Sequence, residues 1–234
     1  MGFATNALMQ TGDSSEHIGA AEQALANLRR AERELLDVFQ HHMPNRSFGC
    51  QDFYLMGIAR RSLAQARAFR SCIEDLNWLV AAALLRLQLD TVLRLYALYW
   101  VADPEDFAGR VFAGEQVNRM KAADGNQMSD RYLIEKIKDQ NAWVESVYKN
   151  TSGLIHFSSR HMHAAIRLKD EQTGLIEGFI GPTDPNHTVE DFTETIEAFF
   201  HCTAMVGVAC GDWFERFNTV ERRPAPGTEE PELP

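Results

Sequence analysis

The chain has 234 residues, of which 45% are hydrophobic and 24% are charged, and both proportions are close to those of ordinary globular proteins. This composition excludes wholesale disorder, collagen-like fibres and small disulfide-dense domains. The 33 acidic and 23 basic residues give a formal net charge of -10. The chain as a whole is therefore poorly suited to bind duplex nucleic acid, because such binding needs many Lys and Arg contacts to phosphates.

Long helices are predicted for the first half of the chain, because apolar residues recur there at steps of three and four. Phe53 and Met56 begin the apolar stripe of the second helix, so they are expected to be buried. The residues before the first helix, 1–13, are predicted to be disordered and to carry no secretory signal. The expected helices run over about 14–42, 52–76, 78–102 and 104–116. Pro44 follows the end of the first of these helices, and Pro104 marks the start of the fourth.

The second half of the chain has a less regular pattern. A helix is expected from Ser129, either breaking near 151–153 or continuing with a kink past His156. Two β-prone segments, 163–168 and 175–180, then predict a hairpin.

These elements predict a mainly α fold. We expect a single helical-bundle domain over 14–220, with about five or six helices and a small β-hairpin at about 163–180 before the last helix. Thr188 is the expected N-cap of that last helix. The segment 221–234 is rich in Pro and Glu and is predicted to be a disordered acidic tail.

The most apolar stretch, residues 78–101, is long enough to span a bilayer. It contains Arg86, Asp90 and Arg94, and ionisable groups near the centre of a membrane span cost several kcal/mol. We therefore predict that it is the central helix of the bundle, that the protein has no membrane partner, and that it is cytoplasmic.

Arg86, Asp90 and Arg94 stand at i, i+4 and i+8 and therefore share one face of that helix. Buried charges must be paired and hydrogen-bonded. One interpretation is a structural ion-pair ladder, in which Asp90 bridges the two arginines and a neighbouring helix supplies a carboxylate. A second is an anion pocket in which the arginines bind a phosphate or carboxylate. A third places this face at a solvated interface.

A second polar group follows in the sequence Tyr-Lys-Asn-Thr-Ser-Gly-Leu-Ile-His, residues 148–156, with His161 and His163 beyond it. His156 lies between two apolar residues and is either a structural residue or a general acid/base, since imidazole titrates near neutral pH. The histidine spacing differs from that of zinc proteases, so no metal site is predicted. The chain also lacks the glycine-rich phosphate loops and the serine nucleophile elbow, so no cofactor is expected.

Arginines also gather on the polar faces of the first two helices. If these helices pack antiparallel, the arginines could merge into one basic patch for a polyanion, although a solvated face is the default expectation. These residues are Arg29, Arg30, Arg33, Arg60, Arg61, Arg67 and Arg70.

Two of these motifs resemble those of a known family. The segment Leu-Leu-Arg-Leu-Gln-Leu-Asp-Thr-Val-Leu-Arg-Leu, residues 84–95, is similar to a helix of the DUF5677-type uncharacterised bacterial helical proteins. In that family a Tyr-x-x-x-Ser-x-x-x-His segment follows further along the chain, and Tyr148, Ser152 and His156 match it. The resemblance covers roughly residues 55–165. This group is similar in turn to the HEPN superfamily of helical bundles.

That resemblance implies a homodimeric helical protein, either a metal-independent ribonuclease or a component of toxin–antitoxin or anti-phage defence systems. It assigns the catalytic positions to His156, Asn150 and Lys149, and Lys149 stands where the family has Arg. A lysine is a point charge that cannot hold a phosphate with two parallel hydrogen bonds. This departure also fits a non-catalytic relative.

Two functions are therefore expected, besides a purely structural role for these polar residues. In the first, the protein acts on RNA and His156 is the general acid/base. The residues that would steady the phosphate or shape the site are Lys149, Arg86, Arg94, Tyr148 and Ser152. In the second, a non-enzymatic homodimeric bundle binds a partner such as an antitoxin protein, or a small anionic ligand, through the face of Arg86, Asp90 and Arg94.

Overall fold

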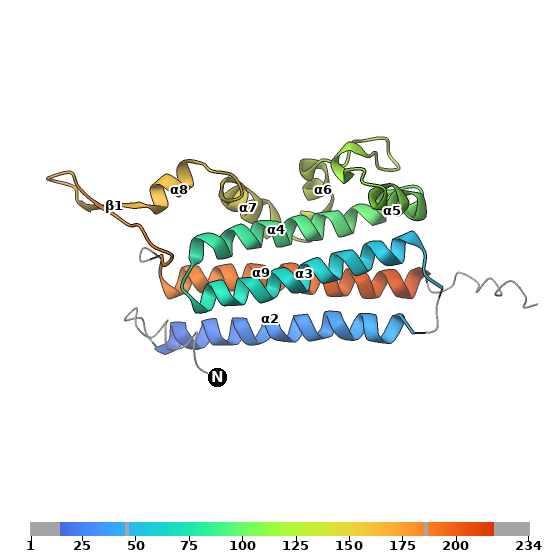
Figure 1. Ribbon diagram of the computed structural model, residues 1–234, viewed down its shortest axis with the longest axis horizontal. Coiled ribbons are helices and arrows are strands. Elements are labelled where there is room, and N and C mark those ends of the chain that lie inside the picture. The colour runs from blue at the N-terminus through green and yellow to red at the C-terminus, as the bar shows by residue number, and fades with distance from the viewer. Residues whose placement is uncertain (1–14, 45–46, 185–186, 218–234) are drawn as a thin grey trace, which may run out of the picture.

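The computed structural model describes residues 15–44, 47–184 and 187–217. The described chain is mostly helical with a small hairpin before the last helix, which confirms the predicted fold class (Figure 1). The predicted disordered segments 1–13 and 221–234 lie outside the described residues. Four long helices form the bundle: α2 (Ser15–His42), α3 (Cys50–Glu74), α4 (Trp78–Ala97) and α9 (Val189–Phe217).

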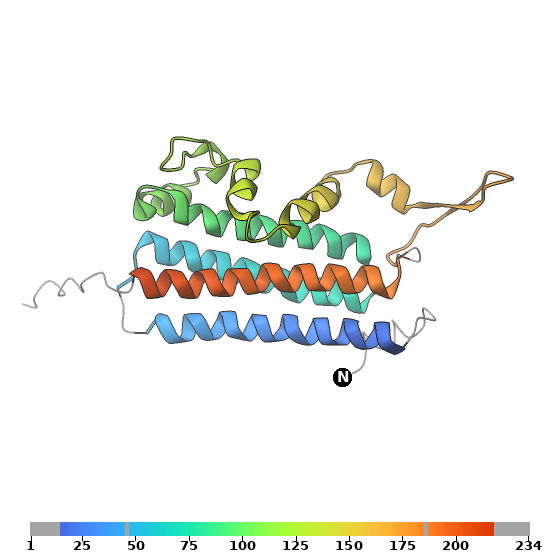
Figure 2. The ribbon, with the colours of Figure 1, turned by 180° about the vertical axis from the view of Figure 1, so that it is seen from behind.

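Three of the bundle helices, α2, α3 and α4, run in alternating directions, whereas α9 runs parallel to α2 (Figure 1, Figure 2). Gly207 of α9 packs against Leu35 of α2. Further along both helices, Phe214 meets Phe39 edge-on and stacks on His42, each at a ring-centroid distance of 5.3 Å. Because these contacts occur in the same order along both helices, the parallel direction follows from the side chains as well.

The core lies among the four long helices and is mainly apolar. Phe69 of α3 stacks on Phe199 of α9 with ring centroids 4.0 Å apart. A polar layer crosses this core, where the buried amide of Gln88 donates hydrogen bonds to the hydroxyls of Ser62 at 2.6 Å and Thr203 at 3.0 Å. Since a buried amide without partners is costly, this layer favours one register of α4 against α3 and α9. Within the described ranges, no helix is both long and apolar enough to cross a bilayer.

The segment between α4 and α9 returns along the outer face of α4 (Figure 1). Side-chain caps set two of its helix starts: Asp103 accepts from the N–H groups of Glu105 and Asp106, and Ser129 accepts from that of Tyr132. α6 and α7 pack on α4, and α5 packs on α3. The helices are α5 (Pro104–Phe112), α6 (Asp130–Ile137), α7 (Trp143–Thr151) and α8 (Ser159–Ala164), with 3-10 turns η2 (Leu98–Trp100), η3 (Val117–Arg119) and η4 (Ser152–Leu154).

A hairpin of β1 (Ile166–Asp170) and β2 (Leu175–Gly178) projects beyond one end of the bundle (Figure 1). Its strands pair antiparallel, and Gly174 makes the turn at a positive φ of 68°. On one face of the hairpin, Arg167 forms an ion pair with Glu177 at 2.8 Å. The opposite face carries three exposed apolar residues, Ile166, Leu168 and Ile176.

The described residues form eight α-helices rather than about five or six, in part because one predicted helix divides. The helix expected from Ser129 ends at Ile137 and a new helix begins at Trp143. Asn141 lies in the break, where its side-chain amide donates to the carbonyl oxygen of Ile137 at 3.2 Å. Such a side-chain bond to the backbone competes with continued helical bonding.

Three other boundaries differ from the prediction. α8 includes residue 163, so β1 begins at Ile166. α4 ends at Ala97, where the chain passes into the 3-10 turn η2. α5 ends at Phe112 rather than near 116, because Gly114 follows at a positive φ of 98° and closes the helix.

Phe53 and Met56 were expected in the core, but both are exposed. Leu55 and Ile58 are buried in their place. At the start of α3 the buried face is therefore rotated away from the predicted stripe, and the ring of Phe53 is left exposed to water.

Candidate functional site

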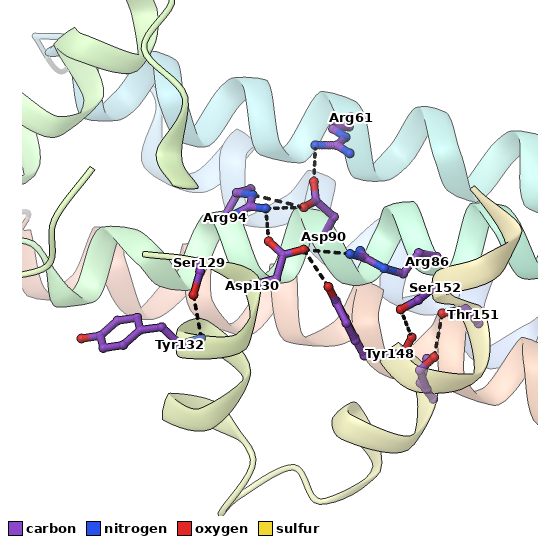
Figure 3. Close-up of polar contacts among 11 residues, drawn as sticks. Arg61, Arg86, Asp90, Arg94, Ser129, Asp130, Tyr132, Tyr148, Thr151 and Ser152 are labelled. Atoms are coloured by element: carbon purple, nitrogen blue, oxygen red, sulfur yellow. Dashed lines mark hydrogen bonds and ion pairs between the residues drawn. The ribbon is translucent and has the colours of Figure 1, made fainter. Parts of the chain in front are cut away.

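Asp130 connects the two arginines of α4 that the sequence singled out (Figure 3). It is the first residue of α6. One of its carboxylate oxygens lies 2.9 Å from Nη2 of Arg86, and the other accepts a hydrogen bond from Nη2 of Arg94. A neighbouring helix thus supplies a carboxylate, as the ion-pair interpretation requires. The acid that bridges both arginines is Asp130, however, and not Asp90.

Asp90 instead joins Arg94 of its own helix to Arg61 of α3. Its carboxylate lies 2.9 Å from Nη2 of Arg94 and 3.1 Å from Nη1 of Arg61. The side chain of Arg86 points toward Asp130 and Tyr148 (Figure 3). Arg86 and Asp90, which are one turn apart on α4, therefore do not pair with each other. We call this chain of ion pairs the arginine network; it runs in the order Arg61, Asp90, Arg94, Asp130, Arg86.

Tyr148 of α7 covers one end of the arginine network. The guanidinium carbon of Arg86 lies 4.3 Å from the centroid of its ring, and its hydroxyl donates to Asp130 at 3.1 Å. A cation over an aromatic face is attracted to it, more strongly where water is excluded. Ser152 does not reach the network: its hydroxyl donates to the backbone carbonyl of Tyr148, at the end of α7.

The arginine network is largely withdrawn from water at Arg86, whose side chain is 5% exposed, and is most open at Arg61, at 40%. Partial burial acts to raise the pKa of Asp130, but Arg94 and Arg86 outweigh it and hold that pKa below its usual range. Burial acts to lower the pKa of Arg94, whereas Asp90 and Asp130 bring it above its usual value. Asp130 and Arg94 are therefore both charged at neutral pH.

The network binds its own charges more readily than an external anion. Two buried nitrogens, Nε of Arg86 and Nη1 of Arg94, have no hydrogen-bond partner among the described residues. Other donors of these two side chains already bind Asp90 and Asp130. A phosphate at this place would have to displace Asp130, so the geometry favours the ion-pair interpretation over the anion pocket.

The three residues that the resemblance assigns to catalysis lie on the surface. Lys149 is 70% exposed and pairs with Glu145 at 2.7 Å. Asn150 donates from its amide to the hydroxyl of Ser146 at 3.5 Å. His156 is exposed between η4 and α8, and it makes no hydrogen bond or ion pair with the residues that the structure describes. Its ring is therefore open to a ligand.

Phe157 and Arg160 are two further candidates, which the sequence reasoning missed. Phe157 is 84% exposed and stacks on His161 with ring centroids 5.5 Å apart. The side chain of Arg160 lies across Gly153, where an added Cβ would be 2.9 Å from its Cδ. One feature of the sequence does point to this region: in this acidic chain, residues 146–169 contain no Asp or Glu.

Ser158 holds the exposed segment in shape. Its hydroxyl donates to the carbonyl of Gly153 at 2.6 Å and accepts from the N–H of Arg160 at 3.3 Å. Its own N–H donates to Nδ1 of His161 at 3.2 Å, so that nitrogen is occupied. We call residues 152–163 the histidine segment. In the part of the chain that the structure describes, no group of three His, Cys, Asp or Glu residues is placed to hold a metal ion.

The arginines of α2 and α3 do not form one continuous basic patch, because acidic residues lie between them. Arg70 pairs with Glu32 at 2.9 Å, and Arg29 lies 3.9 Å from Glu74. Arg30 similarly faces a glutamate on its own helix. These faces are therefore mixed in charge, as a solvated surface usually is.

The candidate site thus has two parts, the arginine network inside the fold and the histidine segment on its surface. Compared with protein-family models, with curated proteins and with solved structures, the chain matches none. The chemistry of these side chains is therefore the guide to function.

Proposed function

We propose that this is a HEPN-like protein that binds single-stranded RNA on the histidine segment and cleaves it without a metal ion. The observation that supports this most is the exposed imidazole of His156, which has no polar partner among the described residues and lies on a stretch without any acidic residue. In a chain of formal net charge -10, such a stretch is where a polyanion meets the least repulsion. The proposal places the protein in the cytoplasm.

The side chains of the histidine segment suit unpaired RNA better than a duplex. An exposed aromatic ring such as Phe157 can stack on a base only where that base is not already paired and stacked. The guanidinium of Arg160 can hold a phosphate with two parallel hydrogen bonds. Lys149 is a weaker candidate because it is a point charge that pairs with Glu145. That pair is exposed to water and therefore weak, so it would yield to a phosphate.

In the proposed reaction, the 2′-hydroxyl of one nucleotide attacks the adjacent phosphorus. His156 takes the hydroxyl proton, and the bond from phosphorus to the 5′-oxygen breaks. The leaving oxygen receives a proton from water, and the hydroxide so formed takes the proton that His156 had accepted. The products are a 2′,3′-cyclic phosphate and a free 5′-hydroxyl, and His156 is neutral again. The chain's own contribution is to orient the phosphate and to move the proton.

The arginine network has a supporting role in this proposal. Tyr148 is anchored by Arg86 and Asp130, and α7 leads directly into η4 and the histidine segment. Fixing α7 on α4 therefore fixes the start of the segment that carries His156.

Cleavage of tRNA and total RNA in the presence of EDTA tests the proposal. Wild type should cleave, and His156→Ala should lose at least about 100-fold in rate, the usual contribution of a general acid/base. The matched control is His41→Ala, another exposed histidine, at the far end of α2, and it should keep full activity. Absence of both RNA binding and cleavage in folded wild type would overturn the proposal.

The homodimer that the resemblance implies is favoured by one observation, the apolar hairpin face of Ile166, Leu168 and Ile176. An isolated two-stranded hairpin is marginally stable in water, and stacking two such faces about a two-fold axis would bury both. Light scattering should show a dimer that Leu168→Ser weakens and that Lys169→Ser, on the opposite face, does not. A monomer at all concentrations would contradict this arrangement.

A further inference from the structure

A cleft lies between α3 and α5. α5 and the start of α3 are at the end of the bundle opposite the hairpin (Figure 1). Its volume is about 260 Å³, just below the range of about 300–1,000 Å³ that is usual for small-molecule sites. The cleft therefore has room for a small ligand only. Its lining includes Phe53, Gly57 and Arg61 of α3 and Phe112 of α5.

Three phenylalanine rings gather at this end of the bundle and are left open to water. Phe112 is 80% exposed, and its ring centroid lies 6.4 Å from that of Phe53. Phe48 lies on the other side of Phe53, with ring centroids 6.1 Å apart. Single exposed apolar side chains are common, but a contiguous group beside a cleft is typical of a binding surface. An apolar ligand would cover the rings of Phe53 and Phe112.

Gly57 lines the cleft without a side chain that would narrow it. A Cβ added at this residue would meet no atom within 4 Å. Glycine inside a helix is unfavourable compared with any residue except proline. Here the missing side chain leaves space where a larger residue would fill the cleft.

Arg61 gives the cleft one charged wall. The arginine network contains three arginines and two aspartates, so one positive charge is not compensated within it. Arg61 is its most exposed member and makes an ion pair with Asp90 through Nη1. A guanidinium has five N–H donors, and its fork matches a carboxylate. A partly exposed guanidinium of a network with excess positive charge thus lies at the edge of an apolar cleft.

We infer that this cleft binds a small carboxylic acid, with the apolar body between α3 and α5 and the carboxylate on Arg61. The inference does not depend on the proposed function. α5, which forms one wall of the cleft, and α8, which belongs to the histidine segment, lie toward opposite ends of the molecule (Figure 1). A variant with a filled cleft should therefore cleave RNA as wild type does.

Isothermal titration calorimetry with octanoate tests the inference. Wild type should bind one octanoate per chain, and its uncharged analogue octanamide should bind at least 10-fold more weakly. Arg61→Gln should lose the preference for octanoate over octanamide, while Asp90 keeps its partner Arg94.

Gly57→Leu should abolish binding, because the new side chain fills the cleft. The matched control is Gly19→Leu: Gly19 is also an exposed helical glycine, on α2, and a Cβ there meets no atom within 4 Å. Both variants should fold, as circular dichroism can verify, since leucine favours a helix. No binding of octanoate by wild type, equal binding of octanamide, or wild-type binding by Gly57→Leu would overturn the inference.

Discussion

Asp130 and Arg86 are 44 positions apart in the sequence, yet their side chains meet at 2.9 Å. Through this contact the first residue of α6 is bound to the middle of α4. Tyr148 joins the same carboxylate from α7. One aspartate thus holds two short helices on the bundle, and those helices lead to the histidine segment.

Removing the charge of Asp130 should destabilise the protein by about 3–5 kcal/mol, because Arg86 would be left buried without a full counter-charge. Asp130→Asn is the direct test, by urea unfolding followed with circular dichroism. The double variant with Arg86→Met should recover much of the loss, since both charges are then gone. Asp139→Asn, an exposed aspartate just beyond α6, should change stability by less than about 0.5 kcal/mol. A similarly small loss for Asp130→Asn would contradict the buried network.

The stability that Asp130 confers should depend on pH in one direction. Its pKa is lower in the folded protein than in the unfolded chain, mainly because Arg94 and Arg86 overcome the effect of burial. The contribution is therefore complete above the unfolded pKa, about 3.9, and is lost as the pH falls through the lower folded value. Urea titrations from about pH 6 to about pH 2 should show wild type and Asp130→Asn converging in acid. A constant difference across this range would rule out the charge as its cause.

The start of α3 should be weakened by changes at a residue far away in sequence. The carboxylate of Glu105 accepts from the N–H groups of Cys50 at 2.6 Å and Gln51 at 3.2 Å, in the manner of a cap. A Cβ at Gly49 would lie 2.7 Å from that carboxylate. Glu105→Ala and Gly49→Ala should each cost about 1 kcal/mol, and the double variant should cost less than their sum. Faster hydrogen exchange of the Cys50 and Gln51 amides in Glu105→Ala would locate the effect at the helix start.

The contact between α2 and α9 should tolerate a small side chain at Gly207 but not a large one. A Cβ there would lie 3.8 Å from Leu35, which is ordinary contact. Gly207→Ala should therefore stabilise the protein by up to about 1 kcal/mol through helix propensity. Gly207→Leu should destabilise it by about 1–3 kcal/mol, because it forces the two helices apart. Thermal unfolding distinguishes the two, and equal effects of both substitutions would contradict the close packing.

The long helices were predictable because their apolar residues keep one period, with prolines at the ends. The break between α6 and α7 was not, because Leu133, Ile137, Val144 and Tyr148 stay in phase across it. No proline or glycine marks the interruption, and the competing hydrogen bond from Asn141 is visible only in the fold. Local periodicity therefore predicts a face but not the continuity of the helix that carries it.

The candidate site was predictable to the same extent. Spacing on one helix placed Arg86, Asp90 and Arg94 on a common face, but it could not find Asp130, which comes from another helix. The apolar spacing on α3 also assigned Phe53 to the core, because the spacing on one helix does not show where the neighbouring helices end. Long-range pairing decides both, and a single sequence carries little information about it.

The parallel pairing of α2 with α9 has a consequence for how the chain is made. Leu35 and Phe39 of α2 pack against Gly207 and Phe214 of the last helix, with most of the protein between them in the sequence. During synthesis the part of the apolar face of α2 that α9 covers stays exposed until α9 has left the ribosome. Contacts so distant in sequence slow folding and leave hydrophobic surface exposed to chaperones or to neighbouring chains. The bundle therefore closes late, and its first helix is the part most exposed to misassembly.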